Sequence, residues 1–502
     1  MEKIAVLELN PNFVKMQQVE VEKNKSYTVY NEISTPINLM KNFEPDCFIK
    51  SSANKDLLDI LKIYKAILDR EEITETICFA SNVLEKAKNS EGLLNEIINA
   101  STFKFEILAP EKEIFYSYTA VINSFNKPKG LVINIGDYNT EMVLYNRRNI
   151  ISTKIIPYGR INLLEKFMNE DVAVRAEKMQ EFISSLLVDC PWDLQTLEEE
   201  WEVVGTGSLF RNLGILSRRA RKYPVEIEHN YVMNYNDAKK VFEAVKNMEP
   251  SRSSKIKGLT NTESMYLSSG LCIVNAIFEK CPIKEFAISR TDREDGMLFH
   301  YALPLTIEKP LTDALGYSLQ VSNDYYDKPS NSNHIYQLAL TLFKLFKVVH
   351  KLNRTYVRVL RIASYLIDCG NRTGIKDSVR AAFGILEHTT LYGVSHSEIM
   401  LACFVSKLRD SDNFNMAEWV RYKEVIGDID IEVVRRLAVI VKIAEALDIS
   451  KFQVVKDVDC DILGDSFILK LVTEGNPTLE IKHALSAVAD FKKAYGKGLE
   501  FM

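Results

Sequence analysis

Two stretches of the sequence end an apolar strand in small and polar residues suited to binding an anion. In 131–145, LVINIGDYNTEMVLY, an apolar strand is followed by Gly-Asp-Tyr-Asn-Thr and by a second strand from Glu141. Such a turn can offer a carboxylate to a metal ion and backbone N–H groups to phosphate oxygens. In 203–216, VVGTGSLFRNLGIL, a strand leads through Gly-Thr-Gly-Ser into a helix, whose first N–H groups also attract anions. From the residues alone, the first turn can be interpreted as a working phosphate loop, as an altered phosphate loop or as a plain hairpin.

The N-terminal stretch 4–16, IAVLELNPNFVKM, has the same layout as 131–145. Each has an apolar strand, an acidic or amide side chain, a polar turn with asparagine, and a second strand. Two similar hairpins in one chain predict a duplicated domain, with NKPKG (126–130) as the hinge between the copies.

The segments around these turns alternate between strand and helix patterns. Residues 55–69 have apolar side chains at helical spacing, and 73–80 have the pattern of a buried strand. This alternation predicts sheets covered by helices. Beyond residue 334 the pattern is nearly all helical, for example in 335–368 and 432–450, and the chain closes with a hairpin and a helix. We therefore expect α/β lobes at 1–125 and 126–305, a helical domain at 306–455, a small α+β domain at 456–502, and a linker at 321–334.

Composition narrows the class of protein. The 502 residues are 46% hydrophobic and 26% charged, with a formal net charge of −5, which is typical of a globular protein. This balance argues against a nucleic-acid coat protein and against a membrane-surface protein. The eight cysteines form no Cys-x-x-Cys pair, which argues against a zinc ribbon and for reduced thiols. We expect a cytoplasmic protein with neither a signal peptide nor a membrane span.

Several segments, taken in chain order, resemble the motifs of the exopolyphosphatase and guanosine-pentaphosphate phosphohydrolase (Ppx/GppA) family. They are IAVLELNPN, FASNVLEKAKN, ILAPEKEIFYSYTAV, LVINIGDYNTEMVLY, IPYGRINLLEKF, WEVVGTGSLF, and SSGLCIVNAIFEK with DREDGML. The resemblance implies an α/β protein with duplicated actin/Hsp70/sugar-kinase-like (ribonuclease H-like) lobes. It also implies an all-helical HD-like domain behind them.

The resemblance also implies a chemistry, the Mg²⁺-dependent cleavage of a terminal phosphoanhydride. Such a reaction needs a cation, backbone donors for the phosphate oxygens and a base that positions water. By position in the motifs, Glu113 and Glu141 are the implied catalytic residues, and Glu8 and Asp137 the implied metal ligands. The implied phosphate-binding residues are Asn12, Asn134, Gly136, Asn139, Thr140, Gly205, Thr206, Gly207 and Ser208.

The sequence departs from the family's motifs at several positions. Asn134 stands where a strand-end aspartate is usual, and an amide supplies no charge to Mg²⁺. Pro11 removes a backbone donor from the first turn. Asp137 and Tyr138 replace two glycines, so the second turn is expected to have changed its shape. Glu85 stands where the family has an arginine.

The helical part offers two further features. Asp368 has no histidine beside it, which argues against the His-Asp metal pair of HD domains. Basic residues at intervals of three or four predict a stripe on one helix face. This stripe is interpreted either as a polyanion groove or as an ordinary solvated face, and its members are Lys347, Lys351, Arg354, Arg358 and Arg361.

Two functions remain open on these grounds. The first is a phosphohydrolase acting on inorganic polyphosphate or guanosine pentaphosphate, favoured by Glu113, Glu141 and the Gly-Thr-Gly-Ser loop. The second is a family member without hydrolysis that binds polyphosphate, a nucleotide or a protein partner as a regulator, favoured by the departures. An actin-like kinase fits the Glu113 segment less well. The resemblance further implies a homodimer, and we expect neither nucleic acid nor a membrane as partner.

Overall fold

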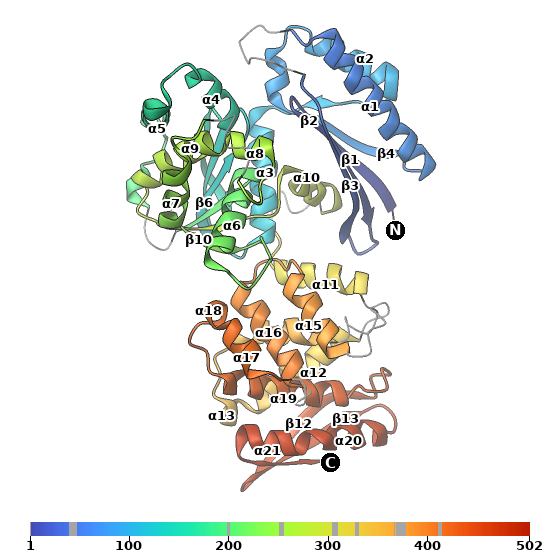
Figure 1. Cartoon of the computed structure of the whole chain (residues 1–502). Coiled ribbons are helices and arrows are strands. Elements are labelled where there is room, and N and C mark those ends of the chain that lie inside the picture. Colours follow the sequence, from blue (N-terminus) through green and yellow to red (C-terminus); the bar gives the residue numbers. More distant parts are fainter. Residues whose placement is uncertain are drawn as a thin grey trace. The chain divides into compact units, whose positions relative to one another are not determined.

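The chain folds into two compact units, described here from a computed structural model (Figure 1). The first comprises Met1–Arg221 with Glu228–Ala314, and the second comprises Lys222–Ile227 with Leu315–Met502. The structure describes residues 2–39, 48–197, 201–249, 256–303, 310–326, 331–365, 367, 378–409 and 414–502.

The first sheet of the first unit contains five strands in the order β3-β2-β1-β4-β5. They are β1 (Glu2–Asn10), β2 (Phe13–Val21), β3 (Tyr27–Pro36), β4 (Glu75–Ala80) and β5 (Glu106–Ile107). The central strand β1 runs antiparallel to β2 and parallel to β4, and its apolar run is buried on both faces, as expected of a central strand. Helices α1 (Ser51–Arg70) and α2 (Ser90–Ser101) cover one face, where their apolar side chains share a core with Leu7 and Leu9.

The second sheet repeats this arrangement. Its order is β10-β11-β9-β6-β7-β8, with β6 antiparallel to β7 and parallel to β9. The strands are β6 (Lys129–Ile135), β7 (Thr140–Asn146), β8 (Asn149–Ile156), β9 (Glu202–Thr206), β10 (Tyr231–Asn234) and β11 (Glu285–Ile288). Strand β6 thus corresponds to β1, and the prediction of two duplicated α/β lobes is confirmed.

The remaining helices of the first unit lie around the two sheets. They are α3 (Pro110–Ser124), α4 (Arg160–Phe167), α5 (Val172–Leu186), α6 (Ser208–Arg221), α7 (Tyr235–Val245), α8 (Asn261–Met265), α9 (Leu267–Lys280) and α10 (Arg293–Ala302), with 3₁₀ turns at Asn82–Lys86 and Leu194–Thr196. Helices α3 and α10 pack closely: a Cβ atom at Gly296 would lie 1.9 Å from the carbonyl oxygen of Tyr116. This close contact fixes the first turn of α10 against the middle of α3.

The second unit is mainly helical and ends in a small sheet. Its helices are α11 (Ala314–Tyr326), α12 (Ser332–Leu345), α13 (Lys347–His350), α14 (Tyr356–Tyr365), α15 (Ser378–His388), α16 (His396–Leu408), α17 (Met416–Arg421), α18 (Lys423–Ile426) and α19 (Ile431–Ala446). They are followed by β12 (Val455–Leu463), β13 (Ser466–Thr473), α20 (Thr478–Ala484), a 3₁₀ turn at Leu485–Ala487, α21 (Val488–Tyr495) and β14 (Gly498–Phe501). A single apolar core joins the helices to the sheet, since Phe346, which follows α12, packs edge-on against Phe467 of β13 and Phe491 of α21.

Two expectations about the second unit are corrected. The linker expected at 321–334 is wrong, because α11 extends to Tyr326 and α12 begins at Ser332. The single basic helix face is also wrong: α13 ends at His350, Lys351 has a left-handed conformation with φ 53°, and α14 begins at Tyr356. Asp368 lies outside the described residues. None of the helices formed by the described residues combines the length and apolar character that a membrane span requires.

Candidate active site between the two hairpin turns

The turns of the two corresponding hairpins lie against each other. Pairing of Asn10 with Phe13 closes the first hairpin, and pairing of Ile135 with Thr140 closes the second. The Asn12 side-chain amide donates to Asp137 Oδ2 at 2.8 Å. These contacts join the two lobes at the ends of their central strands.

The second turn does not require a positive φ at Tyr138. Tyr138 keeps a negative φ and is buried beside Val83 and Ile161, and its hydroxyl donates to Asn12 Oδ1 at 3.0 Å. Asp137 accepts a hydrogen bond from Arg160 Nε at 2.7 Å. A Cβ atom at Gly159 would lie 2.4 Å from the Gly136 carbonyl oxygen, so the start of α4 packs directly on this turn. Both Asp137 oxygens are therefore held by protein groups.

Glu113 lies in the first turn of α3 and is 1% exposed. Its two carboxylate oxygens accept hydrogen bonds from the backbone and the side chain of Asn82, each at 2.9 Å. Burial raises the pKa of Glu113, and the nearby Arg293 partly opposes that rise. A carboxyl group with a raised pKa inside a polar cluster is suited to general base chemistry.

Glu141, on β7, lies in the same cluster and is 2% exposed. Its carboxylate accepts hydrogen bonds from Asn134 at 3.1 Å, from Asn139 at 3.3 Å and from Ser117 at 3.3 Å. Asn134 and Asn139 thus act as donors to this acid. The neighbouring Thr140 is fully buried, and its hydroxyl donates to the Tyr158 carbonyl oxygen at 2.9 Å.

Arg293, the first residue of α10, links the two glutamates. Its Nη1 lies 3.4 Å from Glu113 Oε1, and its Nη2 donates to Glu141 Oε1 at 3.3 Å. Burial lowers the pKa of the guanidinium, but Glu113, Glu141 and further carboxylates outweigh that effect, so it stays charged. The sequence reasoning missed this residue, although an arginine between acids in DREDGML was a visible signal.

Glu8 lies on β1 on the other side of this cluster and is 7% exposed. Its nearest cation is Lys15 of β2, whose Nζ lies 3.8 Å from Glu8 Oε2 and also pairs with Glu294 of α10. Burial raises the pKa of Glu8, while Lys15 and Arg293 oppose the rise.

The Gly-Thr-Gly-Ser loop adjoins the second hairpin. Gly207 has φ 90°, and a Cβ atom there would lie 2.7 Å from Asn134 Oδ1, so the loop and Asn134 are in close contact. The space beside Gly205 is filled by the Phe210 ring, so this glycine serves packing rather than a ligand. Ser208 begins α6 and is half-buried.

Thr206 and Asp292 connect this loop to the start of α10. The Thr206 hydroxyl is buried and donates to the Thr291 carbonyl oxygen at 2.8 Å and to Asp292 Oδ1 at 3.3 Å. Asp292 pairs with Arg211 of α6. Burial alone would raise the pKa of Asp292, but Arg211 and Lys15 hold it below its usual range.

The carboxylates expected to bind Mg²⁺ are held by protein cations. Glu8 faces Lys15, Asp137 is bound by Arg160, and the two glutamates share Arg293. Within the described part of the chain, no three His, Cys, Asp or Glu side chains converge to hold a metal ion. The residues present therefore do not fit a preformed Mg²⁺ site, because oxygen ligands must face the ion to bind it.

The expected basic stripe lies in the second unit and is divided between separate elements. Arg358 pairs with Glu398 at 2.6 Å and donates to the Gly393 carbonyl oxygen. The Arg361 guanidinium lies over the rings of Tyr336 and Tyr365. Two of the five cations are thus engaged within the unit, and the role of the stripe as a polyanion groove stays a prediction.

Comparison with known proteins points to one family. The model of the Ppx/GppA phosphatase family matches residues 19–304. Among curated proteins, the chain is 28% identical over 172 residues to a bifunctional 3-dehydroquinate synthase/phosphatase of Fusobacterium nucleatum, a match that covers 32% of this chain and 26% of that protein. It is 22% identical over 272 residues to retrograde regulation protein 2 of Saccharomyces cerevisiae, covering 50% of this chain and 46% of the relative. The matches span less than half the length of either relative.

Solved structures share the fold of the first unit. A Ppx/GppA family member from Aquifex aeolicus is 20% identical with a TM-score of 0.53, and the match covers 60% of this chain and 98% of that structure. An exopolyphosphatase from Cytophaga hutchinsonii is 15% identical with a TM-score of 0.56, covering 61% and 99%. At these identities the likeness concerns the fold alone.

Proposed function

The chain belongs to the Ppx/GppA phosphatase family, and we propose that its first unit hydrolyses the terminal phosphoanhydride of inorganic polyphosphate or of guanosine pentaphosphate. The observation that carries the proposal is the meeting of Glu113, Glu141 and Arg293 beside Asn134. These residues come from separate segments of the chain, and a buried carboxylate next to a guanidinium combines a base with a phosphate-binding cation.

In the proposed reaction, an incoming phosphate competes for Arg293. The guanidinium contacts Glu113 and Glu141 at 3.4 and 3.3 Å, longer than the roughly 2.7–2.9 Å of strong charge-assisted hydrogen bonds. Transfer of Arg293 to phosphate oxygens frees a Glu113 oxygen, which accepts a proton from the water that attacks the terminal phosphorus. The new O–P bond replaces the bridging P–O bond, which breaks and leaves its electron pair on the departing phosphate of the shortened chain. Asn82 holds the Glu113 carboxylate in place through two hydrogen bonds during this step.

Mg²⁺ remains a prediction from the family resemblance. When bound, such an ion would neutralise phosphate charge. Because the carboxylates assigned to it are paired with cations, the steps above are assigned to Arg293, Glu113 and Asn82 alone.

A second function, a regulator that binds a phosphate ligand or a protein without turnover, is favoured by the turns themselves. The polar groups of these turns hydrogen-bond to one another, through the side chains of Asn12, Asp137 and Tyr138, instead of facing a ligand. The yeast relative, retrograde regulation protein 2, is named for a regulatory role, which is in keeping with this function.

Two assays on the same preparation of the protein distinguish the two functions. Phosphate release from polyphosphate and from guanosine pentaphosphate is measured with Mg²⁺, and binding of both compounds is measured by calorimetry. Release of phosphate supports the hydrolase, whereas micromolar binding without release supports the regulator. The choice between the two substrates, the HD-like nature of the helical part, the homodimer, the cytoplasmic location and the exclusion of nucleic acid as a partner stay predictions.

A further inference from the structure

A pocket in the second unit combines cations with an apolar wall. It has a volume of about 180 Å³ and lies among α19, α21 and the end of α16. Arg435, Ala438, Val439 and Lys442 follow one face of α19, at the i, i+3, i+4 and i+7 positions. The other lining residues are Leu408, Phe414, Asp490 and Lys493.

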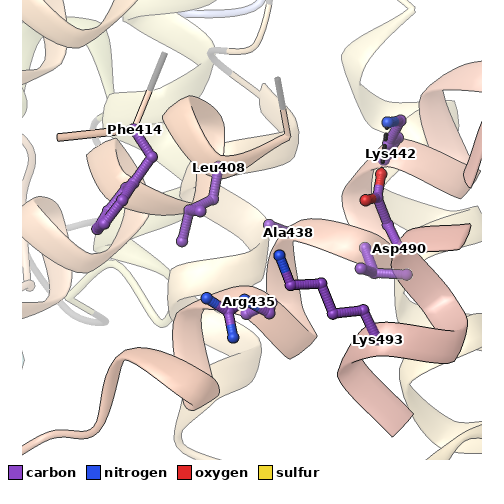
Figure 2. A pocket seen from close by; sticks show the side chains of 8 residues that line it. Leu408, Phe414, Arg435, Ala438, Lys442, Asp490 and Lys493 are labelled. Atoms are coloured by element: carbon purple, nitrogen blue, oxygen red, sulfur yellow. Dashed lines mark hydrogen bonds and ion pairs between the residues drawn. The ribbon is translucent and has the colours of Figure 1, made fainter. Parts of the chain in front are cut away.

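The two kinds of lining are separated within the pocket. Figure 2 shows Leu408 and Phe414 on one side and Lys442 with Asp490 on the opposite side, with Arg435 and Lys493 between them. A ligand in this pocket can therefore place an apolar group against the first side while a charged group reaches the cations.

The lining has an excess of positive charge. Lys442 Nζ pairs with Asp490 at 2.7 Å, and Arg435 pairs with Glu432, which does not line the pocket. Lys493 makes no ion pair with any residue that the structure describes. With the partners Asp490 and Glu432 both counted, one of the three positive charges, that of Lys493, remains without a partner among the described residues.

We propose that this pocket binds a small organic phosphomonoester. A phosphomonoester carries about −1.5 to −2 charges near neutral pH, so it can pair with Lys493 and can also attract Arg435 and Lys442, which lie in ion pairs. Arginine and lysine are the usual partners of phosphate oxygens. The volume is below the roughly 300 Å³ at which pockets for drug-sized molecules begin, so the organic part is a ring or short chain that packs on Leu408 and Phe414. The site lies in the second unit and does not depend on the hydrolytic function proposed for the first.

Phenyl phosphate is the probe, and binding to the full chain is measured by calorimetry. We expect phenyl phosphate to bind at least tenfold more tightly than inorganic phosphate, because only the former uses the apolar side. We expect Lys493→Met to weaken the binding of phenyl phosphate at least tenfold. The matched control is Lys492→Met, one residue earlier on α21 and exposed but outside the pocket, which should change binding less than twofold.

Three results would overturn the proposal: no binding of phenyl phosphate at millimolar concentration, equal affinity for phenyl and inorganic phosphate, or equal effects of the two lysine substitutions. Equal effects of the two lysine substitutions would also show that any observed binding occurs at another site, for example in the first unit. Phe414→Ala supplies an independent check, since it should weaken phenyl phosphate and leave the affinity for inorganic phosphate unchanged.

Discussion

Asn12 donates a hydrogen bond to Asp137 across 2.8 Å, joining the turns of two hairpins that occupy corresponding places in the two lobes. Asp137 replaces a glycine of the family's motif, and Arg160 binds its other oxygen. Asp137 thus ties the second turn to the first hairpin and to the start of α4. Whether a ligand can still enter between the turns depends on the strength of this contact.

Removing the Asn12 amide should destabilise the protein. Asn12→Ala removes two hydrogen bonds, the one that Asn12 accepts from the Tyr138 hydroxyl and the one that it donates to Asp137, which costs about 1–3 kcal/mol of unfolding free energy. Asn12→Asp should cost more at pH 7 than at pH 4, because two carboxylates then face each other. Denaturant unfolding measures both, with Asn149→Ala in the exposed β7–β8 turn as the control. Equal stability of the two alanine variants would contradict this account.

Arg293→Met should lower the free energy of unfolding more than Asn12→Ala does. It leaves Glu113 and Glu141 buried without their shared cation, and breaking a buried pair in this way costs about 3–5 kcal/mol. The pKa of Glu113 is already raised above 4.5 by burial and should rise further. The stability deficit should therefore shrink as the pH falls toward 4.5, because the Glu113 carboxyl, with its raised pKa, becomes neutral. Arg290→Met, at an exposed arginine just before α10, is the control, and equal unfolding midpoints would contradict the expectation.

Much of the fold followed from the sequence because its signals were local. The apolar runs of β1 and β6, the helical spacing of α1 and the repeated hairpin predicted the duplicated lobes correctly. The break between α13 and α14 was not predictable from basic spacing alone, because it depends on a left-handed residue, Lys351, that is neither glycine nor asparagine.

The site was only partly predictable for a different reason. Glu113, Glu141 and Asn134 were found because motifs mark them, and the structure brings them together. Their cations come from segments far away in sequence, and no local pattern pairs Arg293 with Glu113. Ion pairing between distant segments is decided by tertiary packing, here by the contact of α10 with α3 at Gly296.

Asn134→Asp should create a dependence on Mg²⁺. The substitution removes the 3.1 Å hydrogen bond to Glu141 and sets a second carboxylate beside it, which destabilises the fold unless a cation intervenes. Calorimetric melting should show a lower Tm without divalent ions and a rise with millimolar Mg²⁺ that exceeds the rise in the unaltered protein. Asn134→Ala loses the same donor without adding charge and should show no such rise. An equal Mg²⁺ effect on all three proteins would contradict the prediction.

Asp295 gives a prediction about pH. Burial raises its pKa from 3.8 to about 6, although the backbone N–H of Asp292, which donates to Asp295, partly opposes that rise. Between these values the unfolded chain has lost the proton that the folded protein keeps, so this group's contribution to stability falls as pH rises and stays low above pH 6. Asp295→Asn should flatten this slope and raise unfolding free energy at pH 7 by on the order of 1–3 kcal/mol, with little change at pH 3.5. An unaltered slope between pH 4 and 6 in urea unfolding would show that Asp295 is not the group responsible.

The proposed hydrolysis rests on Glu113, and the most direct test is phosphate release by Glu113→Gln beside the unaltered protein. The control is Glu111→Gln, at an exposed glutamate in the same turn of α3. Loss of a catalytic base commonly lowers rates about 10²–10⁴-fold. The account predicts release of phosphate from polyphosphate or guanosine pentaphosphate by the unaltered protein and by Glu111→Gln, with at least about a 100-fold lower rate for Glu113→Gln. Equal rates in all three proteins, or no release by the unaltered protein, would contradict it.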